Sequence, residues 1–173
     1  MPEIQIRVQL SERRNQSGVM SVFVKHGLIA QFQVLGRGSR GPGDTQMSVN
    51  GNTPTGEYEI SRIVDTTGWS QTSYGPNGAL RLKPTSGNAL AAEKNAGRKG
   101  LLIHGGSAGG AGYWRGSGEL RATHGCLRLA NEDVRRLIDS IWQESVNDSK
   151  FVCEPVRVSV SVTDHPMSFQ RPD

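Results

Sequence analysis

The central stretch of this chain is residues 101–133, which read LLIHGGSAGGAGYWRGSGELRATHGCLRLANED. It contains His104 and His124, two of the four histidines, and Cys126, one of only two cysteines. A free thiol with a pKa of about 8.5 is mostly protonated at neutral pH, and a nearby imidazole can accept its proton. A cysteine with a histidine within reach therefore indicates covalent acyl transfer.

The residues around this pair indicate how each is held. The apolar triplet 101–103 predicts the end of a buried strand, which would carry His104 on a rigid element. Gly125 permits a tight backbone turn directly before Cys126. We therefore expect the backbone amides of Gly125 and Cys126 to point at the oxyanion that forms during acyl transfer.

Each of these residues also has a structural interpretation without chemistry. A lone cysteine is commonly a small core residue, and a lone histidine is commonly a hydrogen-bonded structural residue. Zinc binding is a third interpretation, because His104, His124 and Cys126 supply three candidate ligands. No CxxC or HExxH motif accompanies them, and Cys153 lies in a strand-like run. We therefore expect neither a metal nor another cofactor.

The order of these motifs carries a family resemblance. An upstream His-Gly pair, His104-Gly105, is followed by a glycine-rich spacer and then by Thr-His-Gly-Cys at residues 123–126. The spacer covers residues 105–122. This arrangement resembles the signature of the L,D-transpeptidase (YkuD-type) catalytic domain family, including its spacing.

The resemblance implies a cysteine acyltransferase that acts on peptidoglycan stem peptides. Cys126 would attack the carbonyl before the terminal D-Ala, and His104 would act first as base and then as acid toward the leaving amine. Transfer of the acyl group to an amine would give a crosslink or exchange of a D-amino acid. Transfer to water would give L,D-carboxypeptidase activity.

The resemblance also implies supporting roles for other residues of the stretch. The carbonyl of Gly105 would orient the imidazole, and Thr123, His124 and Gly125 would support the cysteine loop and the oxyanion. For Arg128 two roles stay open. Its guanidinium would either bind a substrate carboxylate or form a structural ion pair with Glu132 or Asp133.

The pattern along the chain predicts a mostly β fold. Strands are expected at residues 4–10, 19–25, 28–35, after the turn at 53–56, and at 79–83, 100–106 and 151–162, and helices at 88–95 and 131–145. No alternation of strand and helix is present. We therefore expect an antiparallel β-sandwich or barrel-like sheet with one or two short packed helices, which the L,D-transpeptidase catalytic domain resembles.

Single residues predict where some elements begin and end. Pro84 is expected to close the strand at 79–83, and Pro155 to place the last strand at a sheet edge or a bulge. Asn88 and Asn131 are expected to cap the N-termini of the two helices.

The domain prediction is a single catalytic domain over residues 1–173, with the family resemblance covering roughly residues 19–141 and a polar tail at 163–173. The turn at 53–56 is expected to have a scaffolding role and to line the cleft. Residues 107–119 are interpreted either as a lid over the substrate or as a flexible connection.

Charge and hydropathy limit the kinds of partner that we expect this protein to bind. The net charge is +4 and the pI is near 9.4, but the basic residues are scattered, so nucleic-acid binding is not expected. No run of 18 apolar residues is present, so membrane insertion is not expected. Residues 1–10 predict a strand and not a secretory signal. We expect a monomer.

Because stem peptides that carry D-Ala lie outside the cytoplasmic membrane, we expect the protein to act in the periplasm or cell wall. The export route is open: a signal was trimmed, or another route such as a secretion apparatus carries the folded protein out, or the protein stays inside. In the second case the protein would be an antibacterial effector that damages a competitor's wall, with an immunity protein as a partner. Two different functions are also compatible with the sequence, a non-catalytic cell-wall binding module and a generic cysteine hydrolase.

Overall fold

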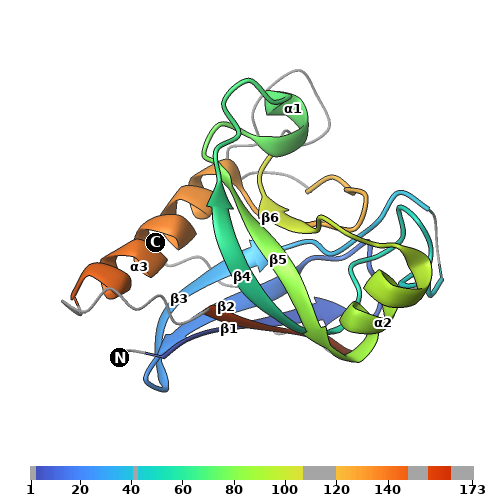
Figure 1. Cartoon of the computed structure of the whole chain (residues 1–173), viewed down its shortest axis with the longest axis horizontal. Helices are drawn as coiled ribbons and strands as arrows, with labels where there is room; N and C mark the ends of the chain where they lie inside the picture. Colours follow the sequence, from blue (N-terminus) through green and yellow to red (C-terminus); the bar gives the residue numbers. More distant parts are fainter. Residues whose placement is uncertain (1–2, 41–42, 107–119, 148–155, 165–173) are drawn as a thin grey trace.

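The structure, a computed structural model, describes residues 3–40, 43–106, 120–147 and 156–164 (Figure 1). The strands within these residues are β1 (Ile4–Ser11), β2 (Gly18–Val24), β3 (Gly27–Val34), β4 (Gly56–Val64), β5 (Ala79–Ser86), β6 (Leu102–His104), β7 (Leu127–Arg128) and β8 (Val156–Thr163). The helices are α1 (Gln71–Tyr74), α2 (Gly87–Ala96) and α3 (Asn131–Asn147). The predicted lid, Cys153, Pro155 and most of the predicted tail lie outside the described residues.

The strands form one sheet in the order β3-β2-β1-β8-β4-β5-β6-β7. Neighbouring strands run antiparallel, except that β1 pairs with β8 and β6 with β7 in parallel. A bridge between Leu35, directly after β3, and Arg128 of β7 brings the two ends of the sheet together. The prediction of a mostly β fold is therefore confirmed, and the single, nearly closed sheet corresponds to its barrel-like form.

The core lies on the inner face of this sheet because apolar residues alternate along its central strands. In β1 and β8 the register pairs Ile6 with Val158 and Val8 with Val160, and all four side chains are buried. Burying an aliphatic side chain of this size contributes about 1.5–3 kcal/mol before the entropy of ordering it is subtracted. These two strands therefore form the centre of the core.

The structure corrects two predictions about the strands, one about the place of β8 in the sheet and one about the end of β5. β8 lies between β1 and β4, so it is an interior strand and not the predicted edge strand. The alternative, a bulge at Pro155, falls outside the described residues. β5 continues through Pro84, which pairs with Tyr58, and the register shifts there between Glu57 and Tyr58. Proline is tolerated at such an irregularity because the position makes no regular ladder bond. On its other side β5 pairs with β6 only near its start.

The helices also differ from the predicted caps. α2 begins at Gly87 with Ser86 as its N-cap residue, and the side-chain amide of Asn88 instead donates to Thr55 Oγ1 at 2.9 Å. Asn131 lies at the first position of α3, and its side-chain oxygen accepts from the Gly106 amide and not from its own helix. Both asparagines therefore bind neighbouring segments.

Helix α3 packs one face toward the sheet (Figure 1). The apolar stripe predicted at helical spacing is present, since Val134, Leu137 and Ile141 are buried in the core. None of the helices in the described residues has the length and apolar character needed to cross a membrane.

Candidate active site

His104 ends the short strand β6, as the apolar triplet before it predicts. Ile103 pairs with Leu80 of β5 on one side and with Leu127 of β7 on the other, and all three are completely buried. Because side chains alternate along a strand, His104 points to the opposite face from Ile103. The imidazole therefore lies on a strand that is hydrogen-bonded on both sides, and only 3% of the residue is exposed.

The imidazole of His104 is neutral in this setting. Burial lowers its pKa to about 4; the hydrogen bond to Gly105 opposes this shift, and the charge of Arg128 adds to it. The Nδ1 atom lies 2.7 Å from the carbonyl oxygen of Gly105. A carbonyl can only accept, so the neutral ring carries its proton on Nδ1 and leaves Nε2 as the acceptor. The ring of Tyr74 lies 5.1 Å away, centroid to centroid.

Cys126 lies directly before β7 and on the same sheet face as the histidine. The parallel register pairs His104 with Arg128, and Cys126 precedes Arg128 by two residues. Its Sγ atom accepts a hydrogen bond from the backbone amide of Leu102 at 3.3 Å. Burial raises the pKa of the thiol, and the Leu102 amide and two nearby arginines oppose the shift. At rest the two groups are therefore a neutral thiol and a neutral imidazole.

The loop before Cys126 is closed by short hydrogen bonds. Thr123 Oγ1 donates to the carbonyl of Cys126 at 2.8 Å and accepts from the Gly125 amide at 3.0 Å. Thr53 Oγ1, from the predicted turn at 53–56, donates to the carbonyl of Gly125 at 2.8 Å. Among the described residues, the Cys126 amide has no hydrogen-bond partner. It is therefore the amide better placed to receive an oxyanion than that of Gly125.

Both the backbone conformation and the lack of space for a Cβ require glycine at position 125. Its φ of 111° lies in a region that other residues rarely adopt, and a Cβ at this position would collide with the guanidinium of Arg98. The glycine of the Thr-His-Gly-Cys motif thus lets the cysteine loop lie against this arginine.

Arg98 is a site residue that the sequence analysis missed. Its guanidinium donates to the carbonyls of Gln46 and Asn52 at 2.6 Å, of Gly51 at 2.8 Å and of His124 at 3.3 Å. It therefore fastens the 46–52 loop to the cysteine loop. No sequence signal marks it, because it follows the end of α2 and its partners are backbone atoms far away in the chain.

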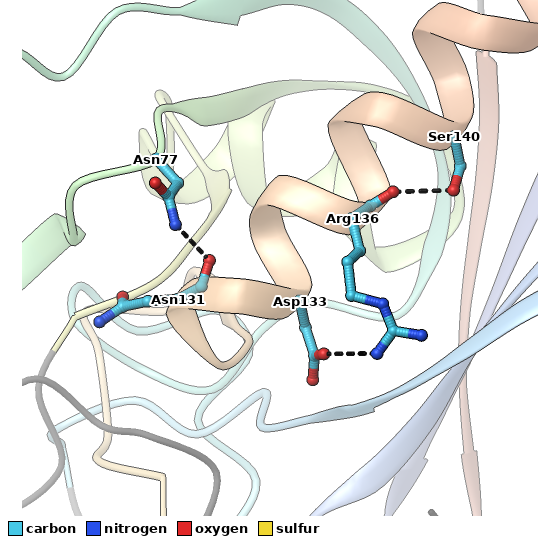
Figure 2. Close-up of polar contacts among 5 residues, drawn as sticks. All are labelled: Asn77, Asn131, Asp133, Arg136 and Ser140. Carbon is cyan, nitrogen blue, oxygen red and sulfur yellow. Dashed lines mark hydrogen bonds and ion pairs between the residues drawn. The ribbon is translucent and has the colours of Figure 1, made fainter. Parts of the chain in front are cut away.

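The remaining predicted residues fall in different places. The side chain of His124 is exposed, and its backbone bridges to Gly38 and accepts from Arg98. Arg128 is buried and donates to the carbonyl of Ser73 at 2.9 Å, next to α1. Of the two acidic residues considered as its partners, Asp133 forms an ion pair with Arg136 at 3.5 Å (Figure 2). Among the described residues, no three His, Cys, Asp or Glu side chains gather as metal ligands.

Comparison with known proteins identifies the family. Residues 6–150 match the model of YkuD, the L,D-transpeptidase catalytic domain. Since the match covers most of the chain, the protein belongs to this family. The matched stretch is longer than the motif resemblance at residues 19–141. No curated protein matches the chain significantly.

Solved structures show the same fold at low sequence identity. Bd1075 from Bdellovibrio bacteriovorus is 15% identical, with a TM-score of 0.55 over 92% of this chain and 48% of that one. The helical cell shape determining protein Pgp2 from Campylobacter jejuni is 18% identical, with a TM-score of 0.54 over 95% and 50%. This chain therefore spans about half the length of either protein.

Proposed function

We propose that the protein is a cysteine acyltransferase of peptidoglycan stem peptides, with Cys126 as nucleophile and His104 as general base. One observation carries the proposal. His104 donates from Nδ1 to the carbonyl of Gly105, which leaves Nε2 free to accept a proton on the sheet face that also carries Cys126. Membership of the L,D-transpeptidase family supplies the substrate class.

The first half-reaction begins from the neutral pair. His104 Nε2 takes the thiol proton as Sγ attacks the carbonyl carbon before the terminal D-Ala, and the carbonyl electrons move to oxygen. The Cys126 amide, with that of Gly125 if its bond to Thr123 is given up, stabilises the oxyanion. The C–N bond then breaks, His104 returns the proton to the leaving amine, and a thioester remains on Cys126.

The second half-reaction runs in the opposite direction. An incoming amine, or water, attacks the thioester carbonyl while His104 accepts its proton, and the thiol is released. An amine of another stem peptide gives a crosslink, a free D-amino acid gives exchange, and water gives L,D-carboxypeptidase activity.

The other motif residues take supporting roles in this proposal. Thr123 and His124 hold the cysteine loop, the first through its hydroxyl and the second through its backbone. Arg128 keeps a proposed role in binding a substrate carboxylate, since the five N–H donors of a guanidinium can bind a carboxylate together with the carbonyl of Ser73. If it acts on stem peptides, we expect the protein to work in the periplasm or cell wall.

The test is mass spectrometry of purified muropeptides after incubation with the protein. Wild type should release D-Ala or exchange it, and Cys126→Ala should abolish this turnover, whereas Cys153→Ala should not. His104→Ala should reduce the rate at least about 100-fold, the usual scale for losing a general base. Equal turnover by Cys126→Ala would refute the assignment of the nucleophile.

A second experiment separates the effector from a housekeeping enzyme. The chain is expressed in a bacterium with and without an added periplasmic signal, beside a Cys126→Ala version of each. Toxicity that requires both the signal and Cys126 supports the effector. Equal growth of all four strains, with turnover intact in the purified protein, supports the housekeeping enzyme.

A further inference from the structure

One peptide group connects the catalytic histidine to the start of α3. The carbonyl of Gly105 accepts from His104 Nδ1 at 2.7 Å, and the amide of Gly106 donates to Asn131 Oδ1 at 2.8 Å. These two polar groups belong to the same planar peptide, in which C=O and N–H point in opposite directions. The orientation of this one plane therefore decides whether His104 has its acceptor.

Asn131 is itself fixed in place. It is buried, and its backbone carbonyl accepts from the side-chain amide of Asn77 at 2.8 Å, while its own side chain extends away from the helix (Figure 2). A Cβ added at Gly75 or Gly105 would collide with Asn131 Oδ1. The asparagine thus fits closely between the segment after α1 and the segment after β6.

The orientation of the Asn131 amide follows from its partner. Turning the amide over would set its NH₂ group against the N–H of Gly106, so the oxygen faces Gly106. Within the part of the chain that the structure describes, the Nδ2 atom is then buried without a hydrogen-bond partner. A buried donor without a partner loses its hydrogen bonds to water and destabilises the folded state. The side chain therefore keeps its bond to Gly106 at the expense of its other polar atom.

We propose that Asn131 is a positioning residue that fixes the tautomer of His104 through the Gly105–Gly106 peptide. Its catalytic consequence rests on the proposed function. When Oδ1 holds the N–H of Gly106, the carbonyl of Gly105 faces the imidazole and retains the proton on Nδ1. Without that bond the peptide can rotate, the imidazole also takes the Nε2–H tautomer, and that tautomer cannot accept the thiol proton.

We expect the other groups around His104 to stay in place when Asn131 is changed. Tyr74 packs its ring near the imidazole, and its carbonyl accepts from the Gly105 amide at 3.1 Å. Arg128 pairs with His104 in the neighbouring strand β7, and Cys126 directly precedes that strand. None of these contacts orients the Gly105 carbonyl, so an effect of Asn131 on the tautomer would arise from the peptide.

The experiment compares Asn131→Leu, which keeps the branched shape without an acceptor, with Asn131→Asp, which keeps an acceptor oxygen. Asn77→Ala is the matched control, since it removes the other contact at the start of α3. Nitrogen NMR of the resting protein reports the His104 tautomer without substrate. Muropeptide turnover across a pH series reports kcat and KM.

We expect the Nδ1–H tautomer in wild type, Asn131→Asp and Asn77→Ala, and a mixture in Asn131→Leu. In Asn131→Leu kcat should fall at least about 10-fold with little change in KM, because general-base help is worth about 10²–10⁴-fold. A folded Asn131→Leu with the wild-type tautomer overturns the proposal. If Asn131→Leu does not fold, loss of the Nδ1–H tautomer in Asn131→Asp overturns it instead. If the tautomers are as expected but neither wild type nor any variant turns over muropeptides, the proposed function is refuted and the positioning role of Asn131 is not.

Discussion

His104 ends strand β6 and Cys126 directly precedes the neighbouring strand β7, but the structure holds the two residues by different kinds of contact. His104 is fixed by its own strand ladder and by the peptide that follows it. The loop that carries Cys126 is fixed by side chains from distant segments, chiefly Arg98 and Thr53, which bind its carbonyls.

The difference shows that the proposed base and the proposed nucleophile depend on the fold in different ways. The position of His104 follows from a strand whose apolar pattern is readable over three residues. The position of Cys126 depends on contacts with the 46–53 loop and with the segment after α2. Variants that disturb distant segments should therefore act on Cys126 more than on His104.

The largest expected effect is that of Arg98→Met. The variant leaves four backbone carbonyls without their donor, and hydrogen bonds to charged groups contribute about 1.5–3 kcal/mol each. The burial that lowers the pKa of Arg98 offsets part of this sum. We expect a loss of about 3 kcal/mol in the free energy of unfolding, measured by denaturant titration.

Arg157→Met is the control for that change. Arg157 is exposed and forms an ion pair of 3.7 Å with Glu3, so its loss should cost no more than about 1 kcal/mol. If Arg98→Met were no worse than Arg157→Met, the cysteine loop would not depend on distant contacts.

A second prediction concerns the histidine and pH. Because the pKa of His104 is about 4 in the folded protein and about 6.5 in the unfolded chain, the unfolded state binds the extra proton between these values. The contribution of His104 to stability is therefore complete above pH 6.5 and is lost as the pH falls toward 4, by about 3 kcal/mol in total. Below pH 4 the loss levels off.

Comparison with His104→Gln isolates this effect, since all other titrating groups are shared. The difference in free energy of unfolding between the two proteins, measured from pH 7.5 to 3.5, should change mainly within that window. A constant difference would show that the imidazole is not buried as a neutral group.

The smallest expected effect is that of Thr53→Val. The hydroxyl of Thr53 is buried and donates to the carbonyl of Gly125, so the substitution leaves one buried acceptor unpaired. We expect a loss of about 1–2 kcal/mol in the free energy of unfolding. Thr72→Val, at an exposed position, should stay within about 0.5 kcal/mol of wild type. If the two variants lost equal free energy of unfolding, Thr53 would not stabilise the cysteine loop.

The sequence predicted those features that depend on local pattern. The triplet before His104 indicated its strand, Gly125 indicated the turn, and the stripe of α3 indicated its buried face. Each follows from periodicity or from backbone freedom within a few residues.

The features that were missed depend on contacts between distant segments. Asn131 had the residue type of a cap, yet it binds Gly106, because the folded sheet brings that amide to the start of α3. Arg98 had no signal because its partners are carbonyls, which every residue possesses. The interior place of β8 was missed because local sequence does not state which strands become neighbours.

That interior place has a consequence for biosynthesis. β8 joins the sheet half made of β1, β2 and β3 to the half made of β4, β5, β6 and β7, although it is the last strand in the described chain. A ribosome that has already produced His104 and Cys126 has therefore produced two half-sheets with no strand between them. Since pairing across such sequence distances forms slowly, we expect the candidate site to be completed only after the final strand emerges.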